Sequence, residues 1–291
     1  MKKIIGKDGC ALPVLGQGAC FLGERPERAN DEKAALSRGF SLGMNLVDTA
    51  EIYGDGGSER LIGDVLRGGA VRRADVLLMT KVCPGNAAPP AVYQSCDASL
   101  QRLGADYIDI YLLHWRDARV PLADTVCGME ELVRRGKILR WGVSNFDAGD
   151  MEELFAIPGG ENCFLNQILY HLGSRGAEYD LLPWLGKHNV AAVAYCPLAQ
   201  GGKLRRTAPD FFTDETLGAL AKKYGASVFQ IMLAFVLRNG DICAVPKAAS
   251  AAHVAENAGA PALAAAITPA EWAVLDGVYL PPAYKMHLDM D

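Results

Sequence analysis

Short apolar runs alternate with amphipathic stretches along the whole 291-residue chain, and this alternation restricts the possible folds more than any other feature. Each apolar run is short, is bounded by turn residues and has the composition of a buried strand. Repeated strand and helix units of this kind form a parallel sheet rather than separate helical and sheet regions. Eight strands are predicted, at Val14–Ala19, Met44–Asp48, Val76–Lys81, Tyr107–His114, Arg140–Asn145, Phe164–His171, Ala191–Tyr195 and Cys243–Lys247.

Eight amphipathic stretches follow these strands, and several open with a proline or with a serine or aspartate that can cap a helix. Eight strands with eight helices predict an α/β fold, the closed (β/α)8 TIM barrel. The competing open doubly wound sheet usually carries a Gly-x-Gly-x-x-Gly turn, but here Gly16 and Gly18 are followed by Phe21. The helices are predicted at Arg28–Leu42, Ser58–Arg67, Pro90–Leu103, Pro121–Arg135, Met151–Phe155, Asp180–Lys187, Asp214–Tyr224 and Ser250–Asn257.

Other segments fall outside this repeat. Lys2–Pro13 contains two short extended pieces around the turn dipeptide Asp8-Gly9, which predicts a β-hairpin that plugs the bottom of the barrel. Ser227–Arg238 and Thr268–Val278 are predicted as two extra helices, with a tail after the second. No linker divides the chain, so a single domain over residues 1–291 is expected, with the plug at 1–13, the barrel at 14–258, and an extra helix with the tail at 259–291.

Charge and composition exclude several classes of partner. The net charge is −5 and no run of five or six lysine or arginine residues occurs, so neither nucleic acid nor an anionic membrane surface is an expected partner. No signal-peptide core and no apolar run of transmembrane length are visible, which predicts a cytoplasmic protein, and a monomer is expected. The eight cysteines form no Cys-x-x-Cys pair and the five histidines lie far apart, so neither a disulfide framework nor a metal site is expected.

Charged or polar side chains end three successive predicted strands. Asp48 precedes Lys81 by 33 residues, and Lys81 precedes His114 by the same 33, which is the length of one strand and helix unit. A barrel gathers the carboxyl ends of its strands around one mouth, so these three side chains are expected at the same height. Tyr53 follows Asp48 in the loop before the next helix and can lean over the same mouth.

These four residue types suit the protonation of an oxygen that gains negative charge. An isolated tyrosine, with a pKa of about 10, is a poor acid at neutral pH, but a neighbouring ammonium favours its ionised form and makes it a better proton donor. Lys81 would supply that charge and Asp48 would pair with Lys81. His114 would direct a carbonyl oxygen towards the tyrosine hydroxyl.

Each of these residues also has a structural explanation when it is taken alone. Asp48 could cap a helix, Lys81 could be a surface charge, Tyr53 could be a packing residue and His114 could be a satisfied core histidine. A metal-dependent hydrolase on the same fold would want clustered ligands, for which only Asp48, His114 and His171 qualify, and His171 is expected to be structural. The shared spacing favours catalysis.

The sequence resembles the aldo-keto reductase family over nearly its whole length. The stretch DTAEIYGDGGSE, followed by TKV and YLLHW, is similar to the family's catalytic tetrad, which implies that role for Asp48, Tyr53, Lys81 and His114. The segments WGVSNF, LNQILYH, AYCPLAQG and VPKAAS lie where the family binds a nicotinamide cofactor. The resemblance implies Ser144, Asn145 and Gln167 at the carboxamide, Tyr195 against the nicotinamide ring, Leu198 near the pyrophosphate, and Lys247, Ser250, His253, Glu256 and Asn257 at the adenosine end.

Two departures from the family pattern bear on specificity. Members that prefer NADPH often carry serine or threonine and arginine where this chain has Ala248 and His253, although Lys247 is retained as a partner for the 2′-phosphate. NADPH is therefore the expected cofactor, with NADH as an alternative. The segment GQGACF places Cys20 and Phe21 where many relatives have a large aromatic residue, so these two residues are candidate walls of the substrate pocket.

The resemblance implies an oxidoreductase that reduces a small aldehyde or ketone to an alcohol, with hydride from NADPH and a proton from Tyr53. Within the family the chain is most similar to a bacterial branch that includes methylglyoxal reductase and diketogluconate reductase-like proteins. The short segment after His114 predicts an open pocket beside Trp115, so methylglyoxal, diketo sugars and aromatic aldehydes are candidate substrates. The alternative is an NADP(H)-binding redox sensor or regulatory subunit with little turnover.

Overall fold

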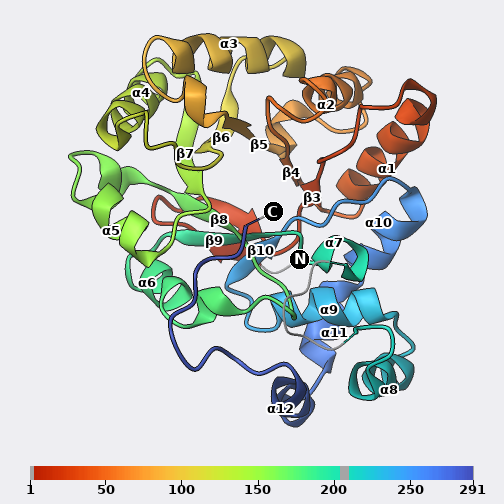
Figure 1. Cartoon of the computed structure of the whole chain (residues 1–291). Helices are drawn as coiled ribbons and strands as arrows, with labels where there is room; N and C mark the ends of the chain where they lie inside the picture. The colour runs from red at the N-terminus through yellow and green to blue at the C-terminus, as the bar shows by residue number, and fades with distance from the viewer. Residues whose placement is uncertain (1–2, 204–209, 291) are drawn as a thin grey trace.

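The computed structural model describes residues 3–203 and 210–290, and its fold is the (β/α)8 TIM barrel that the alternating sequence predicts. Helices form a ring around the strands (Figure 1). The eight barrel strands are parallel and run in the order β10-β9-β8-β7-β6-β5-β4-β3. Parallel bridges from Leu15 to Ala244 and from Gly18 to Lys247 join the two ends of this row, which closes the sheet.

All eight strands lie within or beside the predicted ranges, and most are shorter than predicted. The first run shortens most, since only Gln17 and Gly18 form a strand and Leu15 joins the sheet through a single bridge. The strands are β3 (Gln17–Gly18), β4 (Leu46–Asp48), β5 (Leu77–Val82), β6 (Ile108–Leu113), β7 (Ile138–Ser144), β8 (Leu165–Leu169), β9 (Ala191–Tyr195) and β10 (Ile242–Ala244).

The predicted helices are all present, and local capping signals start several of them. Asp147, Ser227 and Thr268 each accept a hydrogen bond from the third backbone N–H of the following helix and form a capping box. The short helices α7 (Ala199–Gly202) and α11 (Ala260–Ala266) were not predicted. The others are α1 (Ala29–Ser41), α2 (Gly57–Arg67), α3 (Ala91–Leu103), α4 (Leu122–Arg134), α5 (Ala148–Phe155), α6 (Leu181–Lys187), α8 (Glu215–Tyr224), α9 (Val228–Leu237), α10 (Ala251–Ala258) and α12 (Pro269–Val278).

Between β9 and β10 lie the short α7 and the longer helices α8 and α9, and the sequence pattern assigns the roles of α8 and α9 the wrong way round. It makes Asp214–Tyr224 a barrel helix and Ser227–Arg238 the addition. In the structure α9 packs against β10, α10 and α11, whereas α8 packs against α9 and α12 on the outside. The reason is composition, because α9 is apolar on nearly all sides and buries seven of its residues, while α8 is amphipathic and buries three.

Apolar side chains form separate layers inside and outside the barrel wall. The inner cluster includes Leu46, Met79, Ile110 and Val193, all buried. Their neighbours along the strands point outwards to the helices and belong to a second, larger cluster. This alternation follows from the two-residue period of a strand.

A β-hairpin of β1 (Lys3–Ile5) and β2 (Ala11–Pro13) covers the amino-terminal end of the barrel, as predicted. Leu12 is fully buried and joins the inner cluster, with Ile4 packed against it. Lys7 donates hydrogen bonds to the carbonyl oxygens of Glu161 and Cys163, just before β8. The hairpin therefore seals one end of the barrel and leaves the carboxyl ends of the strands as the open mouth.

Among the described residues, no single helix is long and apolar enough to cross a membrane. Two pairs of helices pass that test of length and composition only when they are taken together. They are Glu215–Tyr224 with Val228–Leu237, bent by 91°, and Ala251–Ala266 with Pro269–Val278, bent by 108°.

Leu12→Ala should lower the free energy of unfolding by about 2–5 kcal/mol, because it leaves a cavity where the hairpin meets the inner cluster. The matched control is Ile5→Ala in the same hairpin, whose side chain is 67% exposed and whose loss should cost less than about 0.5 kcal/mol. Urea denaturation of both variants measures the difference. Equal costs would contradict the role of the hairpin as a plug.

Candidate active site

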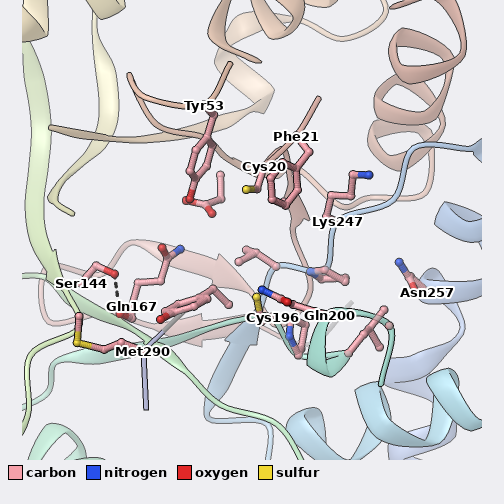
Figure 2. Close-up of a pocket in the computed structure, with 18 of the residues that line it drawn as sticks. Cys20, Phe21, Tyr53, Ser144, Gln167, Cys196, Gln200, Lys247, Asn257 and Met290 are labelled. Carbon is pink, nitrogen blue, oxygen red and sulfur yellow. Dashed lines mark hydrogen bonds between the residues drawn. The ribbon is translucent and has the colours of Figure 1, made fainter. Parts of the chain in front are cut away.

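A cavity of about 880 Å³ opens at the carboxyl ends of the barrel strands. Figure 2 shows side chains from both sides of the barrel converging on it. Barrels place their reactive groups at this end, and a cavity of this size suits a small-molecule ligand. Of the seventeen residues predicted for the site, fifteen line the cavity: Cys20, Phe21, Asp48, Tyr53, His114, Trp115, Ser144, Asn145, Gln167, Tyr195, Leu198, Lys247, His253, Glu256 and Asn257.

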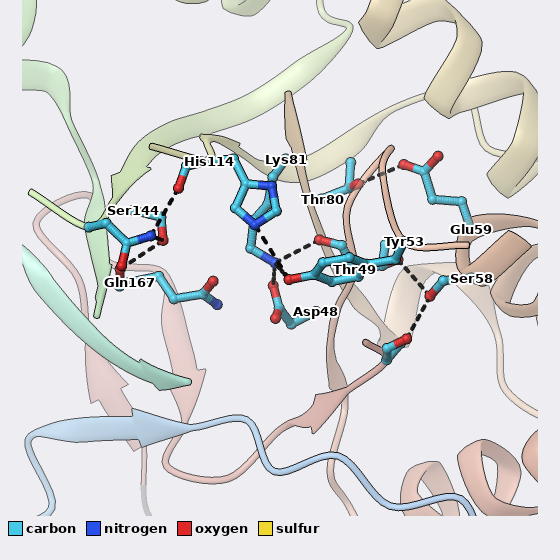
Figure 3. Close-up of polar contacts among 12 residues, drawn as sticks. Asp48, Thr49, Tyr53, Ser58, Glu59, Thr80, Lys81, His114, Ser144 and Gln167 are labelled. Atoms are coloured by element: carbon cyan, nitrogen blue, oxygen red, sulfur yellow. Dashed lines mark hydrogen bonds and ion pairs between the residues drawn. The ribbon is translucent and has the colours of Figure 1, made fainter. Parts of the chain in front are cut away.

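Lys81 lies just behind the cavity wall and connects the other polar groups. Its Nζ atom is 2.6 Å from Asp48 Oδ1 and 2.8 Å from the backbone oxygen of Thr49. The same Nζ atom is 3.3 Å from the Tyr53 hydroxyl (Figure 3). The structure therefore brings the three side chains together as the spacing predicts.

The ion pair between Lys81 and Asp48 is sealed from water. Lys81 is fully buried and Asp48 is 5% exposed. Burial raises the pKa of the Asp48 carboxyl, while the adjacent Lys81 ammonium opposes that rise through its charge and hydrogen bond. A buried ammonium is stable only with such partners, and Asp48 provides one of them beside the Tyr53 hydroxyl.

His114 approaches the Tyr53 hydroxyl from the neighbouring strand end. Its Nε2 atom is 3.5 Å from that oxygen, at the long limit of a hydrogen bond. Burial first, and the Lys81 charge second, lower the pKa of the imidazole to about 2. The ring is therefore neutral at ordinary pH, and it can share a hydrogen bond with Tyr53 or with a ligand oxygen without adding a second cation.

Polar side chains at the ends of β7, β8 and β9 form a connected group. Ser144 Oγ donates to the Gln167 backbone oxygen at 2.9 Å. Asn145 has a left-handed backbone with φ of 63°, and its Nδ2 donates to the His114 backbone oxygen at 3.1 Å. Tyr195 donates its hydroxyl hydrogen to Asn145 Oδ1 at 2.8 Å. Together they hold the aromatic ring of Tyr195 in place along the cavity.

The far end of the cavity is formed by the β10–α10 connection. Lys247, His253, Glu256 and Asn257 line it, with Leu198 on the side of β9. Ser250 is absent from the lining, and its hydroxyl instead caps α10 by accepting the His253 N–H at 3.3 Å. Ser250 was predicted at the adenosine end of the cofactor site, and in the structure it is the N-cap residue of α10.

Aromatic side chains form the rim near Tyr53. Phe21 is 63% exposed and has a left-handed backbone with φ of 63°, and Trp115 is 36% exposed. The rings of Trp115 and His114 lie 4.7 Å apart between centroids. Cys20 sits beside Phe21 over the same space (Figure 2).

Sequence reasoning missed several lining residues. Ile52 flanks Tyr53 in the same loop, which is a signal that the motif already offered. Gln200 and Lys203 come from α7 and the residue after it, and Met290 comes from the C-terminal tail. Asp289 accepts a hydrogen bond from Ser174, which holds the tail over the mouth. No local pattern in the sequence indicates which face of the barrel that tail crosses.

Among the residues that the structure describes, no group of three or more histidine, cysteine, aspartate or glutamate side chains could hold a metal ion. His171 is buried beside the tail, and burial lowers the pKa of its imidazole to about 4. Its Nδ1 accepts the Gly173 backbone N–H at 3.1 Å. This contact fits a structural histidine.

The geometry agrees with comparisons to known proteins. The sequence pattern of the Aldo/keto reductase family matches residues 14–280. The chain belongs to this family. Methylglyoxal reductase YeaE of Escherichia coli (strain K12) is 45% identical over 280 residues, which cover 96% of this chain and 95% of that protein. Methylglyoxal reductase DkgA of Yersinia pestis is 32% identical and covers 86% and 83% of the two chains.

Solved structures of other family members have the same architecture. A crystal structure of an aldo-keto reductase from Klebsiella pneumoniae in complex with NADPH matches this aldo/keto reductase with a TM-score of 0.93 and 45% identity, over 100% of this chain and 99% of that chain. The predicted family is confirmed.

The burial of His114 should make the stability of this aldo/keto reductase depend on pH. Unfolded histidine has a pKa of 6.5, whereas the folded His114 has a pKa of about 2, so below about pH 6.5 the unfolded state binds the extra proton and stability falls as the pH falls. His171 acts in the same direction. His114→Gln should remove about 2 kcal/mol of the stability lost between about pH 7 and pH 5, and urea denaturation at both values checks this. An identical pH dependence in wild type and variant would contradict a buried neutral His114.

Proposed function

We propose that the protein is an NADPH-dependent carbonyl reductase in which Tyr53 donates the proton. One observation carries the proposal. The Tyr53 hydroxyl lies 3.3 Å from the fully buried Lys81 ammonium and 3.5 Å from His114 Nε2, at the mouth of the barrel. The relative YeaE is a methylglyoxal reductase, which supports the same reaction class.

The side chains divide the reaction among them. Tyr53 and His114 hydrogen-bond the carbonyl oxygen and hold the carbonyl carbon towards the cofactor cleft. NADPH, when bound, supplies the hydride to that carbon. The oxygen gains negative charge as the C=O π bond breaks, and Tyr53 transfers its proton to it. The Lys81 ammonium stabilises the phenolate that Tyr53 becomes, and Asp48 keeps Lys81 charged. Tyr53 then recovers a proton from solvent.

The cavity offers a fit for a nicotinamide cofactor. Gln167 Nε2 is buried and directed towards Asp48 without a hydrogen bond of good geometry, so it has a donor for a ligand carboxamide. Ser144 and Asn145 would complete that contact, and the flat face of Tyr195 would stack on the ring. The NADPH complex of the Klebsiella pneumoniae relative supports NADPH as the cofactor.

Basic side chains in the cavity lining favour NADPH over NADH. Lys247 and His253 line the cavity at its far end, and Lys203 adds a third basic side chain. A 2′-phosphate carries negative charge that NADH lacks, so these side chains interact more favourably with NADPH. We propose Leu198 beside the pyrophosphate, Glu256 and Asn257 at the adenosine, and Ser250 as the residue that holds the first turn of α10 in place.

The substrate space suits small carbonyl compounds. Phe21, Trp115 and Met290 form an apolar rim around Tyr53, and Cys20 is a small side chain in the same wall. Methylglyoxal, diketo sugars and aromatic aldehydes are the proposed substrates. We further expect the enzyme to act as a single-domain monomer in the cytoplasm.

Tyr53→Phe should leave NADPH binding nearly unchanged and lower kcat by about 10²- to 10⁴-fold, because it removes the proton donor and leaves the ring. Lys81→Met should lower kcat similarly. Steady-state kinetics with methylglyoxal and fluorescence titration with NADPH measure the two effects. Near-normal turnover by Tyr53→Phe would exclude Tyr53 as the donor.

Lys247→Met should raise the Kd for NADPH by about 10- to 100-fold, which is the loss expected for one charge-assisted contact. NADH serves as the internal control, and its Kd should change little. Fluorescence titration of the same variant with both cofactors makes the comparison. Equal weakening of NADPH and NADH binding would show that Lys247 does not contact the 2′-phosphate.

A scan of methylglyoxal, diketo sugars and aromatic aldehydes with each cofactor tests the substrate class. Steady turnover with NADPH and at least one of these carbonyls is expected. NADPH binding without turnover of any of them would favour a redox sensor.

A further inference from the structure

We propose that Glu59 is a positioning residue for carbonyl reduction, because its buried carboxylate ties the loop that carries Tyr53 to the strand that carries Lys81. The inference rests on the proposed function. It concerns a residue that touches neither the cavity nor the four reactive side chains, since the cavity lining contains none of Glu59, Thr80 and Arg102.

Three side chains form what we call the Glu59 clasp: Glu59 in the first turn of α2, Thr80 in β5 and Arg102 near the end of α3. Thr80 Oγ1 donates to Glu59 Oε1 at 2.6 Å. Arg102 Nε donates to Glu59 Oε2 at 2.6 Å. Glu59 is fully buried, so both of its oxygens are committed to charge-assisted or short contacts from two other elements.

The clasp acts on the strand at the residue next to Lys81. Thr80 and Lys81 are neighbours in β5, and successive side chains of a strand point to opposite faces. Lys81 therefore reaches Tyr53 on the inner face, while Thr80 reaches Glu59 on the outer face. Figure 3 shows both contacts on the same strand.

The clasp also acts on the loop at its exit. The Tyr53 loop ends at Gly56 and Gly57, where α2 begins. The side chain of Arg102 packs on Gly56, since a Cβ atom added there would lie 2.5 Å from Arg102 Cδ. The entry and exit of the loop are joined as well, because Thr49 Oγ1 donates to Ser58 Oγ at 2.8 Å and the Ser58 N–H donates to the Tyr53 backbone oxygen at 3.2 Å.

Loosening the clasp should affect chemistry more than cofactor binding. The Tyr53 hydroxyl must stay close to Lys81 Nζ, and a displacement of about 1 Å at a reacting group can cost about 100-fold in rate. The cofactor contacts lie on β7 to β10 and α10, away from α2. If Glu59 had a purely structural role, its substitution would lower thermal stability and leave the kcat of the folded enzyme unchanged.

The test compares Glu59→Gln with Asp109→Asn, a matched change at the opposite end of the barrel. Asp109 is also a buried carboxylate, and its Oδ2 atom lies 2.7 Å from Nη2 of Arg73. The side chains of Arg73 and Asp109 are 23% and 8% exposed, which resembles the 21% and 0% of Arg102 and Glu59. Both variants should lose thermal stability. Only Glu59→Gln should lower kcat, by about 10- to 100-fold, with the Kd for NADPH unchanged in both.

The pH profile of kcat separates positioning from general damage. Among the described residues, Lys81 on β5 and His114 at the end of β6 contact the Tyr53 hydroxyl, and Asp48 on β4 pairs with Lys81. A Tyr53 that moves away from Lys81 has a less stabilised phenolate, so the alkaline limb of kcat should shift to higher pH in Glu59→Gln and stay in place in Asp109→Asn.

Thr80→Val provides a milder second variant if Glu59→Gln does not fold. It keeps the shape of Thr80, removes only the hydroxyl, and should lower kcat about 10-fold with the same shift of the alkaline limb. If the kinetics of Glu59→Gln or Thr80→Val match those of Asp109→Asn, the inference about Glu59 is overturned and the proposed function stands. A wild-type enzyme that reduces no carbonyl compound would overturn the proposed function as well.

Discussion

The buried ion pair of Lys81 and Asp48 is the interaction on which the rest of the site depends. A fully buried ammonium is strongly unfavourable without a partner, and removing one member of such a pair typically costs about 3–5 kcal/mol. Those partners are Asp48, the last residue of β4, and the backbone oxygen of Thr49, which follows it, and β4 pairs with the strand that carries Lys81. Once the ammonium is held there, the phenol of Tyr53 has a fully buried positive charge beside its oxygen at the wall of the cavity.

Burial, and that charge after it, keep His114 neutral. The imidazole is buried and faces the Lys81 ammonium, and both effects oppose a second positive charge. A neutral ring can therefore orient a carbonyl oxygen without competing with Tyr53 as an acid. The proposed separation of roles between a phenol donor and a neutral imidazole follows from burial of the imidazole and from one cation placed beside both groups.

The barrel divides the mouth into regions with different chemistry. The ends of β4, β5 and β6 carry the proposed proton-transfer groups, and the ends of β7, β8 and β9 carry amides and the Tyr195 ring. Lys247 and His253 lie beyond β10. Each region consists of a few residues at the ends of strands, so the ring of helices can hold these groups in fixed relative positions. Contacts on the outer face of the barrel wall, such as that between Thr80 and Glu59, can therefore influence the position of side chains on the inner face of the same strand.

The amino-acid sequence by itself determined the eight strands, the order of the helices and the grouping of Asp48, Lys81 and His114, because strand period and strand ends are local properties that repeat with the length of one unit. Only the tertiary structure decided which of α8 and α9 covers the barrel, that Ser250 caps a helix rather than lining the cavity, and that Met290 of the tail reaches the mouth. These outcomes depend on packing between segments far apart in the chain, and no short stretch of residues encodes which surface another segment will cover.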